Sequence, residues 1–188
     1  MNQALGRHQD LGVAYTGIPS LEELRASPGY PRPADLEKGP IGVIECVQEI
    51  PCNPCELACR QGAIVVGEPI TNLPRFEAER CTGCGLCISI CPGQAIFLVH
   101  LHYSAEESLV TFPFEYLPLP VVGSRVPAVD RAGTVVCQAT VIKVQTSRSF
   151  DRTAVVTIAI RNRRNGSSAV HRRAGTRCQP QDMPPPWP

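Results

Sequence analysis

The pattern of apolar and polar positions is clearest in the second half of the chain. Residues 134–144 and 153–160 are rich in β-branched side chains, which favour strands, and the glycines and prolines before them supply turns. Two strands are stable only if they bury one face against other parts of the chain. The pattern therefore predicts a small antiparallel β domain at residues 121–160.

Residues 1–40 are expected to form an N-terminal arm. Leu21–Leu24 can make one or two helical turns with Ser20 as the N-cap, and the proline-rich stretch 28–33 ends any helix. Two interpretations stay open. The arm is either a leader that hugs the surface or is disordered, or an ordered docking arm.

Two further segments are a connector at residues 100–120 and a tail at residues 161–188. The tail is proline-rich, has no apolar periodicity and is expected to be disordered. It holds six arginines and one aspartate, a charge of +5, so the net charge of +1 leaves −4 for residues 1–160. Because no aromatic residues are interleaved with these arginines, a nucleic-acid partner is not expected.

The chain has 188 residues and ten cysteines. Its cellular compartment determines whether these cysteines form disulfides or bind metal. No apolar run approaches the roughly 20 residues of a transmembrane helix. The N-terminus also lacks the basic start and apolar core of a secretory signal. A cytoplasmic protein is therefore expected, and since cytosolic thiols stay reduced, the cysteines are expected to bind metal rather than form disulfides.

Eight of the ten cysteines lie within residues 41–99, in two groups. The second group, Cys81-x2-Cys84-x2-Cys87-x3-Cys91-Pro92, has the spacing of bacterial ferredoxins at every position. The first three thiolates of such a run reach three irons of one cubane from a single tight loop. Gly83 and Gly85 suit this loop because glycine tolerates unusual backbone angles. The fourth cysteine is expected to begin a helix and to bind the other cluster.

The first group, Cys46-x5-Cys52-x2-Cys55-x3-Cys59, repeats the last two spacings of the second. A shift of 32 residues superposes its last three cysteines on Cys84, Cys87 and Cys91. This internal repeat predicts a pseudo-twofold duplicated unit, each copy with a cluster loop, a short helix after the fourth cysteine, and a strand. The predicted fold class is α+β, with a bacterial dicluster ferredoxin-like core at residues 41–99 and the arm and β domain as additions.

The ligand sets follow from the crossing of the fourth cysteine of each run to the other cluster. Cluster one is assigned to Cys46, Cys52, Cys55 and Cys91, and cluster two to Cys81, Cys84, Cys87 and Cys59. An uncrossed assignment stays open. Two zinc sites with four cysteines each are a further alternative, although zinc hooks need neither this run nor a near-copy of it.

Two departures from the repeat bear on the clusters. Arg60 stands where the second unit has Pro92. Its guanidinium either lies beside cluster two and raises the reduction potential, or faces solvent. The longer gap at residues 47–51 either shields cluster one or belongs to a docking face. Cys137 and Cys178 have no partner at metal spacing, so we expect a core residue and an exposed thiol.

Two stretches go beyond a generic ferredoxin, namely Ile44–Glu56 and Gly67–Pro74. They resemble the small dicluster ferredoxin-like subunit of multisubunit flavin-dependent amino-acid dehydrogenases. That family includes the dye-linked proline and hydroxyproline types and their opine-oxidising and cyanide-forming relatives. Ala128–Arg131 and Phe150–Thr153 resemble the C-terminal β part of the same subunits, and the resemblance covers Gly17–Ile160.

The resemblance implies a protein with no catalytic site of its own. Flavin in partner dehydrogenase subunits would oxidise an amine or amino acid, and two 4Fe–4S clusters here would relay the electrons singly towards a further acceptor. The cysteine spacing alone supports only electron transfer through two clusters. A free-standing dicluster ferredoxin and a structural zinc protein are the alternative functions.

Overall fold

The computed structural model describes residues 12–150, 152–162 and 177–178, and its elements fall into two sheets and several short helices. The strands of the seven-stranded sheet lie in the order β1-β4-β5-β8-β7-β6-β9, and every neighbouring pair is antiparallel. Their bounds are β1 Ile41–Ile44, β4 Ile96–His100, β5 Glu107–Phe114, β6 Arg125–Val129, β7 Val135–Gln145, β8 Ala154–Arg161 and β9 Arg177–Cys178. Strands β2 (Ile64–Val65) and β3 (Arg75–Phe76) form a second, two-stranded sheet.

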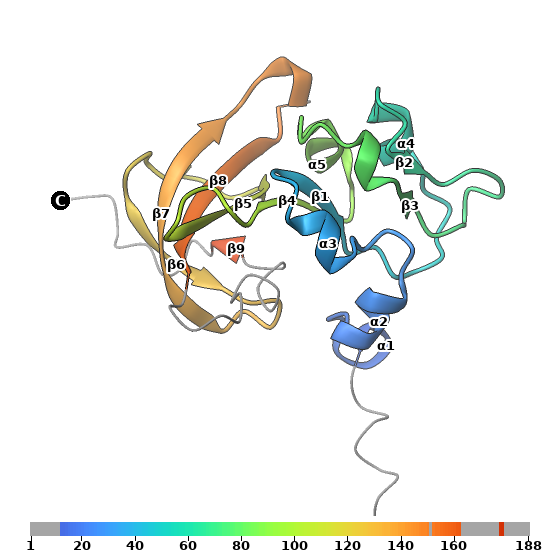
Figure 1. Ribbon diagram of the computed structural model, residues 1–188, viewed down its shortest axis with the longest axis horizontal. Coiled ribbons are helices and arrows are strands. Elements are labelled where there is room, and N and C mark those ends of the chain that lie inside the picture. Colours follow the sequence, from blue (N-terminus) through green and yellow to red (C-terminus); the bar gives the residue numbers. More distant parts are fainter. Residues whose placement is uncertain (1–11, 151, 163–176, 179–188) are drawn as a thin grey trace, which may run out of the picture.

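The helices are short and lie outside the large sheet (Figure 1). Their bounds are α1 Val13–Thr16, α2 Leu21–Ala26, α3 Pro33–Leu36, α4 Pro54–Ala58 and α5 Leu86–Ile90, with 3-10 turns η1 Ala78–Arg80 and η2 Arg148–Phe150. A mixed arrangement of this kind is compatible with the predicted α+β ferredoxin-like class.

The β domain shares its sheet with the cysteine-bearing region. The strands predicted at residues 134–144 and 153–160 are present as β7 and β8. Residues 100–120, expected to be a connector, contain the eight-residue strand β5, which pairs with β4 on one side and β8 on the other. The alternation of buried side chains along β5 places Val110 and Phe112 in the core. The two regions are therefore joined by continuous strand pairing.

Two apolar clusters hold the chain together. The larger one spans the sheet from β1 to β8 and includes Val43, Phe97, Phe112 and Ile158, all of them buried. The smaller one contains Ile44, Ile88 and Phe150 among others, and five of the ferredoxin-type cysteines pack against it: Cys46, Cys55, Cys59, Cys87 and Cys91. These five cysteines therefore pack against apolar side chains that include residues of α5, β4 and η2.

Residues 12–40 of the N-terminal arm pack on the cysteine-bearing region. The Ser20 side chain accepts a hydrogen bond from the Glu23 amide, which caps α2, and Leu24 is fully buried. Ser27 Oγ donates to the carbonyl of Cys46 at 3.0 Å, and the Phe76 amide donates to the carbonyl of Pro28 at 3.1 Å. Residues 12–40 therefore lie against the rest of the chain, and a role of the arm in docking stays a prediction.

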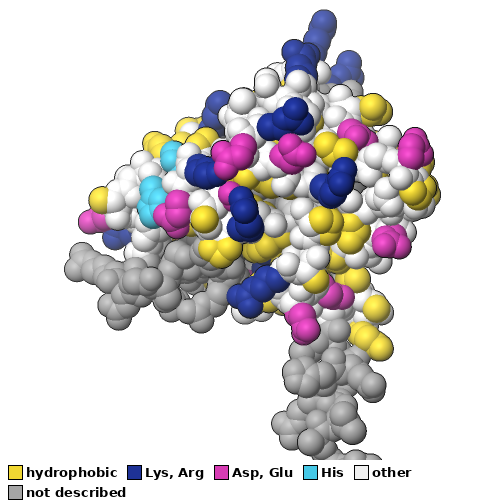
Figure 2. Space-filling view, turned by 45° about the vertical axis from the view of Figure 1, so that its right-hand side comes forward, with side chains coloured by type: hydrophobic (Ala, Val, Ile, Leu, Met, Phe, Trp, Pro, Cys, Tyr) yellow, Lys and Arg dark blue, Asp and Glu magenta, His cyan; other side chains and the backbone are white. Residues whose placement is uncertain are grey.

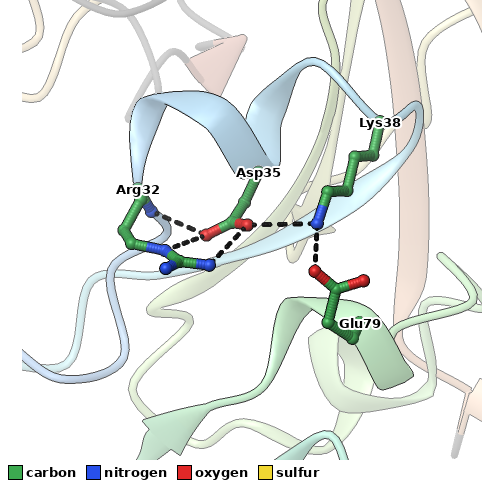
Figure 3. A network of polar contacts seen from close by, with 4 residues as sticks. All are labelled: Arg32, Asp35, Lys38 and Glu79. Atoms are coloured by element: carbon green, nitrogen blue, oxygen red, sulfur yellow. Dashed lines mark hydrogen bonds and ion pairs between the residues drawn. The ribbon is translucent and has the colours of Figure 1, made fainter.

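A polar network fastens α3 to the segment before Cys81 (Figure 3). Arg32 donates to both carboxylate oxygens of Asp35, with Nε–Oδ2 and Nη2–Oδ1 distances of 2.8 and 3.0 Å. Lys38 bridges from Asp35, at 3.4 Å, to the carboxylate of Glu79 in η1. The hydrogen bonds from Arg32 outweigh the effect of burial and hold the pKa of Asp35 below its ordinary value.

Two residues of the predicted tail, Arg177 and Cys178, form β9 and pair with Val129 and Ala128 of β6. This pairing corrects the expectation of a wholly disordered tail, while the Cys178 side chain and residues 163–176 and 179–188 lie outside the described residues. Within the part of the chain that the structure describes, no helix has the length and apolar character needed to span a membrane. On the face in Figure 2, basic, acidic and hydrophobic side chains are interspersed.

Candidate iron–sulfur centres

Each cysteine group is carried by a tight loop that leads into a short helix. Gly83 and Gly85 have φ of 66° and 81°, in the left-handed region that the sequence predicts for them. A Cβ atom on Gly83 would lie 2.7 Å from the carbonyl oxygen of Pro40, so the close approach of the loop to the residue before β1 also requires glycine. The path of this loop therefore depends on glycine at position 83 for two separate reasons.

The helices precede the fourth cysteine of each group, so the expectation of a helix after it is wrong. Cys59 is the C-cap of α4 and Cys91 is the C-cap of α5. Pro92 disfavours the helical conformation of the residue before it, and Cys91 is extended with φ −74° and ψ 111°. In the first unit the chain turns at Gly62, whose amide donates to the Cys59 carbonyl at 2.9 Å.

Corresponding elements of the two groups recur at the same offset. α4 starts at Pro54 and α5 at Leu86, 32 positions later, and β2 and β4 start 32 positions apart at Ile64 and Ile96. The amide of Ala63 donates to Cys59 Sγ at 3.2 Å, and the amide of Ala95 donates to Cys91 Sγ at 3.4 Å. Both fourth cysteines therefore have their sulfur held by the backbone amide four residues later.

The eight cysteines surround two cavities, four to each. The first has an empty space of about 400 Å³, solvent at its mouth included, and its cysteines are Cys46, Cys52, Cys55 and Cys91. The second has about 390 Å³, and its cysteines are Cys59, Cys81, Cys84 and Cys87. Each cavity thus takes three cysteines from one group and the last cysteine from the other.

The donor set and the lining fit a 4Fe–4S cluster at each cavity. Four cysteine thiolates are the ligands that such a cluster takes in proteins. Apolar side chains line both cavities beside the cysteines, with Ile44, Ile96 and Pro92 at the first cavity and Ile64, Leu86 and Leu98 at the second. Among the described residues, no three His, Cys, Asp or Glu side chains are grouped as a site for a single metal ion.

Burial favours the protonated form of three of these thiols, those of Cys46, Cys55 and Cys87, in the metal-free chain. It raises the pKa of Cys55 to about 11 and that of Cys87 to about 12, and neighbouring cysteines add to both shifts. Burial also raises the pKa of Cys46. Because the ligand form is the thiolate, loading of either site must release protons.

Part of Gly67–Pro74, one of the two stretches that resemble the dehydrogenase subunits, lines the first cavity. Asn72 and Pro74 from Gly67–Pro74 line it together with Gln48 and Ile50 from the longer loop. The Cys52 amide donates to the carbonyl of Ile70 at 3.1 Å, which fixes this stretch against the first cysteine group. The extra residues between Cys46 and Cys52 therefore line the cavity, a position compatible with both the shielding and the docking interpretation of that gap.

Sequence reasoning missed a buried ion pair beside Cys46. Arg131, at the turn between β6 and β7, donates Nε to Glu45 Oε2 at 2.8 Å and Nη2 to Oε1. The two side chains are only 13% and 6% exposed. Tyr30 of the arm lies next to the pair, and burial raises the pKa of its hydroxyl. An arginine in a turn, far in sequence from its acidic partner, gave no signal of this contact.

The structure also shows the surroundings of Arg60 and Cys137, which the sequence analysis discussed. Arg60 is exposed and lines the second cavity with Cys59 and Cys84, so it both faces solvent and lies beside the candidate cluster. Cys137 is partly buried against the larger apolar cluster, in line with a packing role.

Comparisons with known proteins agree with iron–sulfur binding. Residues 74–97 match the family described as 4Fe-4S binding domain. The chain is similar to a component of the ion-translocating oxidoreductase complex of Methanosarcina acetivorans, 47% identical over 49 residues, 26% of this chain and 17% of that protein. It is similar to a component of the Na(+)-translocating ferredoxin:NAD(+) oxidoreductase complex of Acetobacterium woodii, 42% identical over 56 residues, 30% of this chain and 15% of that protein.

A weaker similarity, 27% identical over 106 residues, links the chain to Protein Pixie of Drosophila melanogaster and covers 48% of this chain and 17% of that protein. The matched segments span less than a fifth of each relative. No solved structure matches the chain. Residues 74–97 are therefore a 4Fe–4S binding segment, and an iron–sulfur protein of the electron-transfer type is the class that these similarities support.

Proposed function

We propose that this chain is the electron-transfer subunit of a larger oxidoreductase complex and holds two 4Fe–4S clusters. The observation that carries the proposal is the division of eight cysteines into two sets of four around two cavities. When bound, a 4Fe–4S cluster accepts and releases one electron at a reduction potential set by its surroundings. The residues of this chain supply the thiolates, the apolar walls and the amide hydrogen bonds to sulfur.

The proposed ligand sets are crossed between the two groups. Cluster one takes Cys46, Cys52, Cys55 and Cys91, and cluster two takes Cys59, Cys81, Cys84 and Cys87. The lining of the two cavities supports this division. The common offset of 32 residues between α4 and α5 supports a duplicated unit as its origin. With crossed ligand sets, each cluster is bound by cysteines from both groups.

The proposed partner is a flavin-containing dehydrogenase subunit that acts on an amino acid or amine, with the flavin bound there and not in this chain. The resemblance at Ile44–Glu56 and Gly67–Pro74 supports this choice, because both stretches contribute to the mouth of the first cavity. The names of the two oxidoreductase relatives describe components of complexes, which supports a hetero-oligomer.

Apolar side chains near the first cavity support a partner contact on that side. Ile50 and Ile70 are 46% and 38% exposed. Ile50 lines the cavity itself, and the Ile70 carbonyl accepts from the amide of Cys52. Large apolar residues exposed around a redox site are typical of docking faces.

Anaerobic purification of the full chain from its own cells tests the partner. We expect flavin-containing subunits to co-purify and expect an amino acid such as proline to bleach the iron–sulfur absorbance of the complex. A brown, monomeric protein without flavin would identify a free-standing ferredoxin instead. A colourless protein rich in zinc would exclude both.

A further inference from the structure

A second feature of the cluster-two side is a groove between the Cys84 loop and the large sheet. Its empty space, which includes open solvent at its mouth, is about 990 Å³. Gly83, Cys84 and Gly85 form one wall. Cys84 is exposed, whereas the other seven cysteines of the two groups are partly buried, and it lines both this groove and the second cavity. The groove therefore leads directly to a ligand of proposed cluster two.

The opposite wall is a face of three adjacent strands. Each strand contributes two residues that are two positions apart and so share a face: Leu109 and Thr111 of β5, Val155 and Thr157 of β8, and Lys143 and Gln145 of β7. The register aligns Thr111 with Thr157 and Thr157 with Lys143. The two hydroxyls hydrogen-bond each other at 2.9 Å. The wall is a polar row with aliphatic side chains beside it, which suits a flat ligand.

A β-bulge directs an additional side chain into the groove. The register of β7 against β8 shifts between Val141 and Lys143, so Ile142 is the extra residue. Consecutive strand residues normally point to opposite faces, yet Ile142 and Lys143 both line the groove. Bulges re-aim side chains and are over-represented beside functional sites. The sheet is thus locally irregular where it faces Cys84.

The charge of the groove favours a ligand with oxygen acceptors. Lys143 lines it together with His100 and Tyr103, and among the residues that the structure describes no carboxylate lines it. The Lys143 ammonium and the Gln145 amide are donors at this wall. Aliphatic surface flanked by donors is the environment that a planar ring with carbonyl groups requires.

We propose that this groove binds the planar, carbonyl-bearing ring of a redox-active carrier, placed between the Cys84 loop and the strand face. Lys143 and Gln145 would donate to the oxygens of the ring, and Ile142 would cover one edge. The inference rests on the proposed function, because a cluster ligated by Cys84 is what gives the position its redox role. A ligand at this position would also explain why the large sheet places β7 and β8 opposite the Cys84 loop.

Riboflavin is a fluorescent probe with such a ring and stands in for a diffusible carrier, which is distinct from the flavin proposed to be held in the partner subunit. Titrated with the cluster-loaded full chain, it is expected to show saturable quenching of its fluorescence. Lys143→Glu should weaken the apparent affinity about tenfold or more, because it replaces a charged donor by a repelling carboxylate. Gln145→Glu, which keeps the size of the side chain, should weaken it as well. Arg125→Glu, an identical charge change on β6 outside the groove, should leave the affinity within about twofold.

The proposal is overturned if the loaded protein gives no saturable quenching, or if Arg125→Glu weakens binding as much as Lys143→Glu. Iron content and one-electron reduction of the same samples separate this result from a failure of the proposed function. Loaded, reducible clusters without ring binding would remove the groove proposal alone. Absence of iron from the purified chain would remove the proposed function.

Discussion

Arg131 and Glu45 form a two-pronged ion pair that links the β6–β7 turn to the residue before Cys46. The partners are 86 positions apart in sequence and almost fully shielded from solvent. Glu45 is also held through its amide, which donates to the Ala95 carbonyl at 2.8 Å. The β domain therefore contacts the first cysteine group directly and helps to fix where Cys46 lies.

Replacing Arg131 by methionine should strongly destabilise the loaded protein. The Glu45 carboxylate would be left buried and unpaired, which typically lowers the free energy of unfolding by about 3–5 kcal/mol. Urea unfolding followed by loss of iron–sulfur absorbance measures the change. Arg125→Met, at an exposed arginine of β6, is the matched control and should cost about 0.5 kcal/mol or less. Equal stability of the two variants would show that the ion pair does not hold the domains together.

Serine substitutions test the crossed ligand sets. Cys91→Ser should damage cluster one, whose other proposed ligands are Cys46, Cys52 and Cys55, while Cys59→Ser should damage cluster two. Electron paramagnetic resonance of the reduced variants identifies the altered centre, with Cys52→Ser and Cys84→Ser as references for clusters one and two. A Cys91→Ser spectrum that resembles Cys84→Ser rather than Cys52→Ser would establish the uncrossed assignment.

Gly83→Ala should weaken cluster two more than its backbone angle alone explains. The new Cβ would meet the Pro40 carbonyl oxygen at 2.7 Å, in addition to the cost of about 1–2 kcal/mol for a positive φ. Gly85→Ala, in the same loop, separates the two effects, since Gly85 has φ 81° and an added Cβ would make only ordinary contacts, 3.7 Å from Leu98 and 3.8 Å from Ile88. The rate of iron loss to a chelator measures both variants. The contact with Pro40 is unimportant if they behave alike.

The docking of α3 should depend on pH through Asp35. Its pKa in the folded chain is lowered from 3.8, so its ionised form stabilises the folded arm above that pH, and the contribution is lost as pH falls through the folded-state value. Asp35→Asn should therefore speed amide hydrogen exchange over residues 33–38 at pH 7. Glu22→Gln, at an exposed acid of α2, serves as the control. Unchanged exchange in Asp35→Asn would mean that the network of Figure 3 does not hold the arm.

The parts of the fold that sequence predicts are those with local signals. The cysteine spacing and the glycines between them anticipate the loop at residues 81–91, because the angles of Gly83 and Gly85 are set within a few residues. The β-branched runs anticipate β7 and β8 for the same reason. Ser20 and Glu23 likewise mark the start of α2.

The parts that sequence misses depend on tertiary contacts. Strand β5 contains Pro113, and its burial follows from pairing with β4 and β8, which lie far apart in sequence. The order of the arm follows from the burial of Leu24, and the clamp on Glu45 comes from a turn 86 positions away. The groove beside Cys84 needs strands β5, β7 and β8 together, so no single segment signals it.

The central claim is that this chain binds two 4Fe–4S clusters and cycles them between redox states. The most direct test is the iron and acid-labile sulfide content of the anaerobically purified chain, combined with electron paramagnetic resonance during a reductive titration. We expect about eight irons and about eight sulfides per chain, with two centres that each take up one electron. About four irons with a single centre, or zinc in place of iron, would contradict the claim.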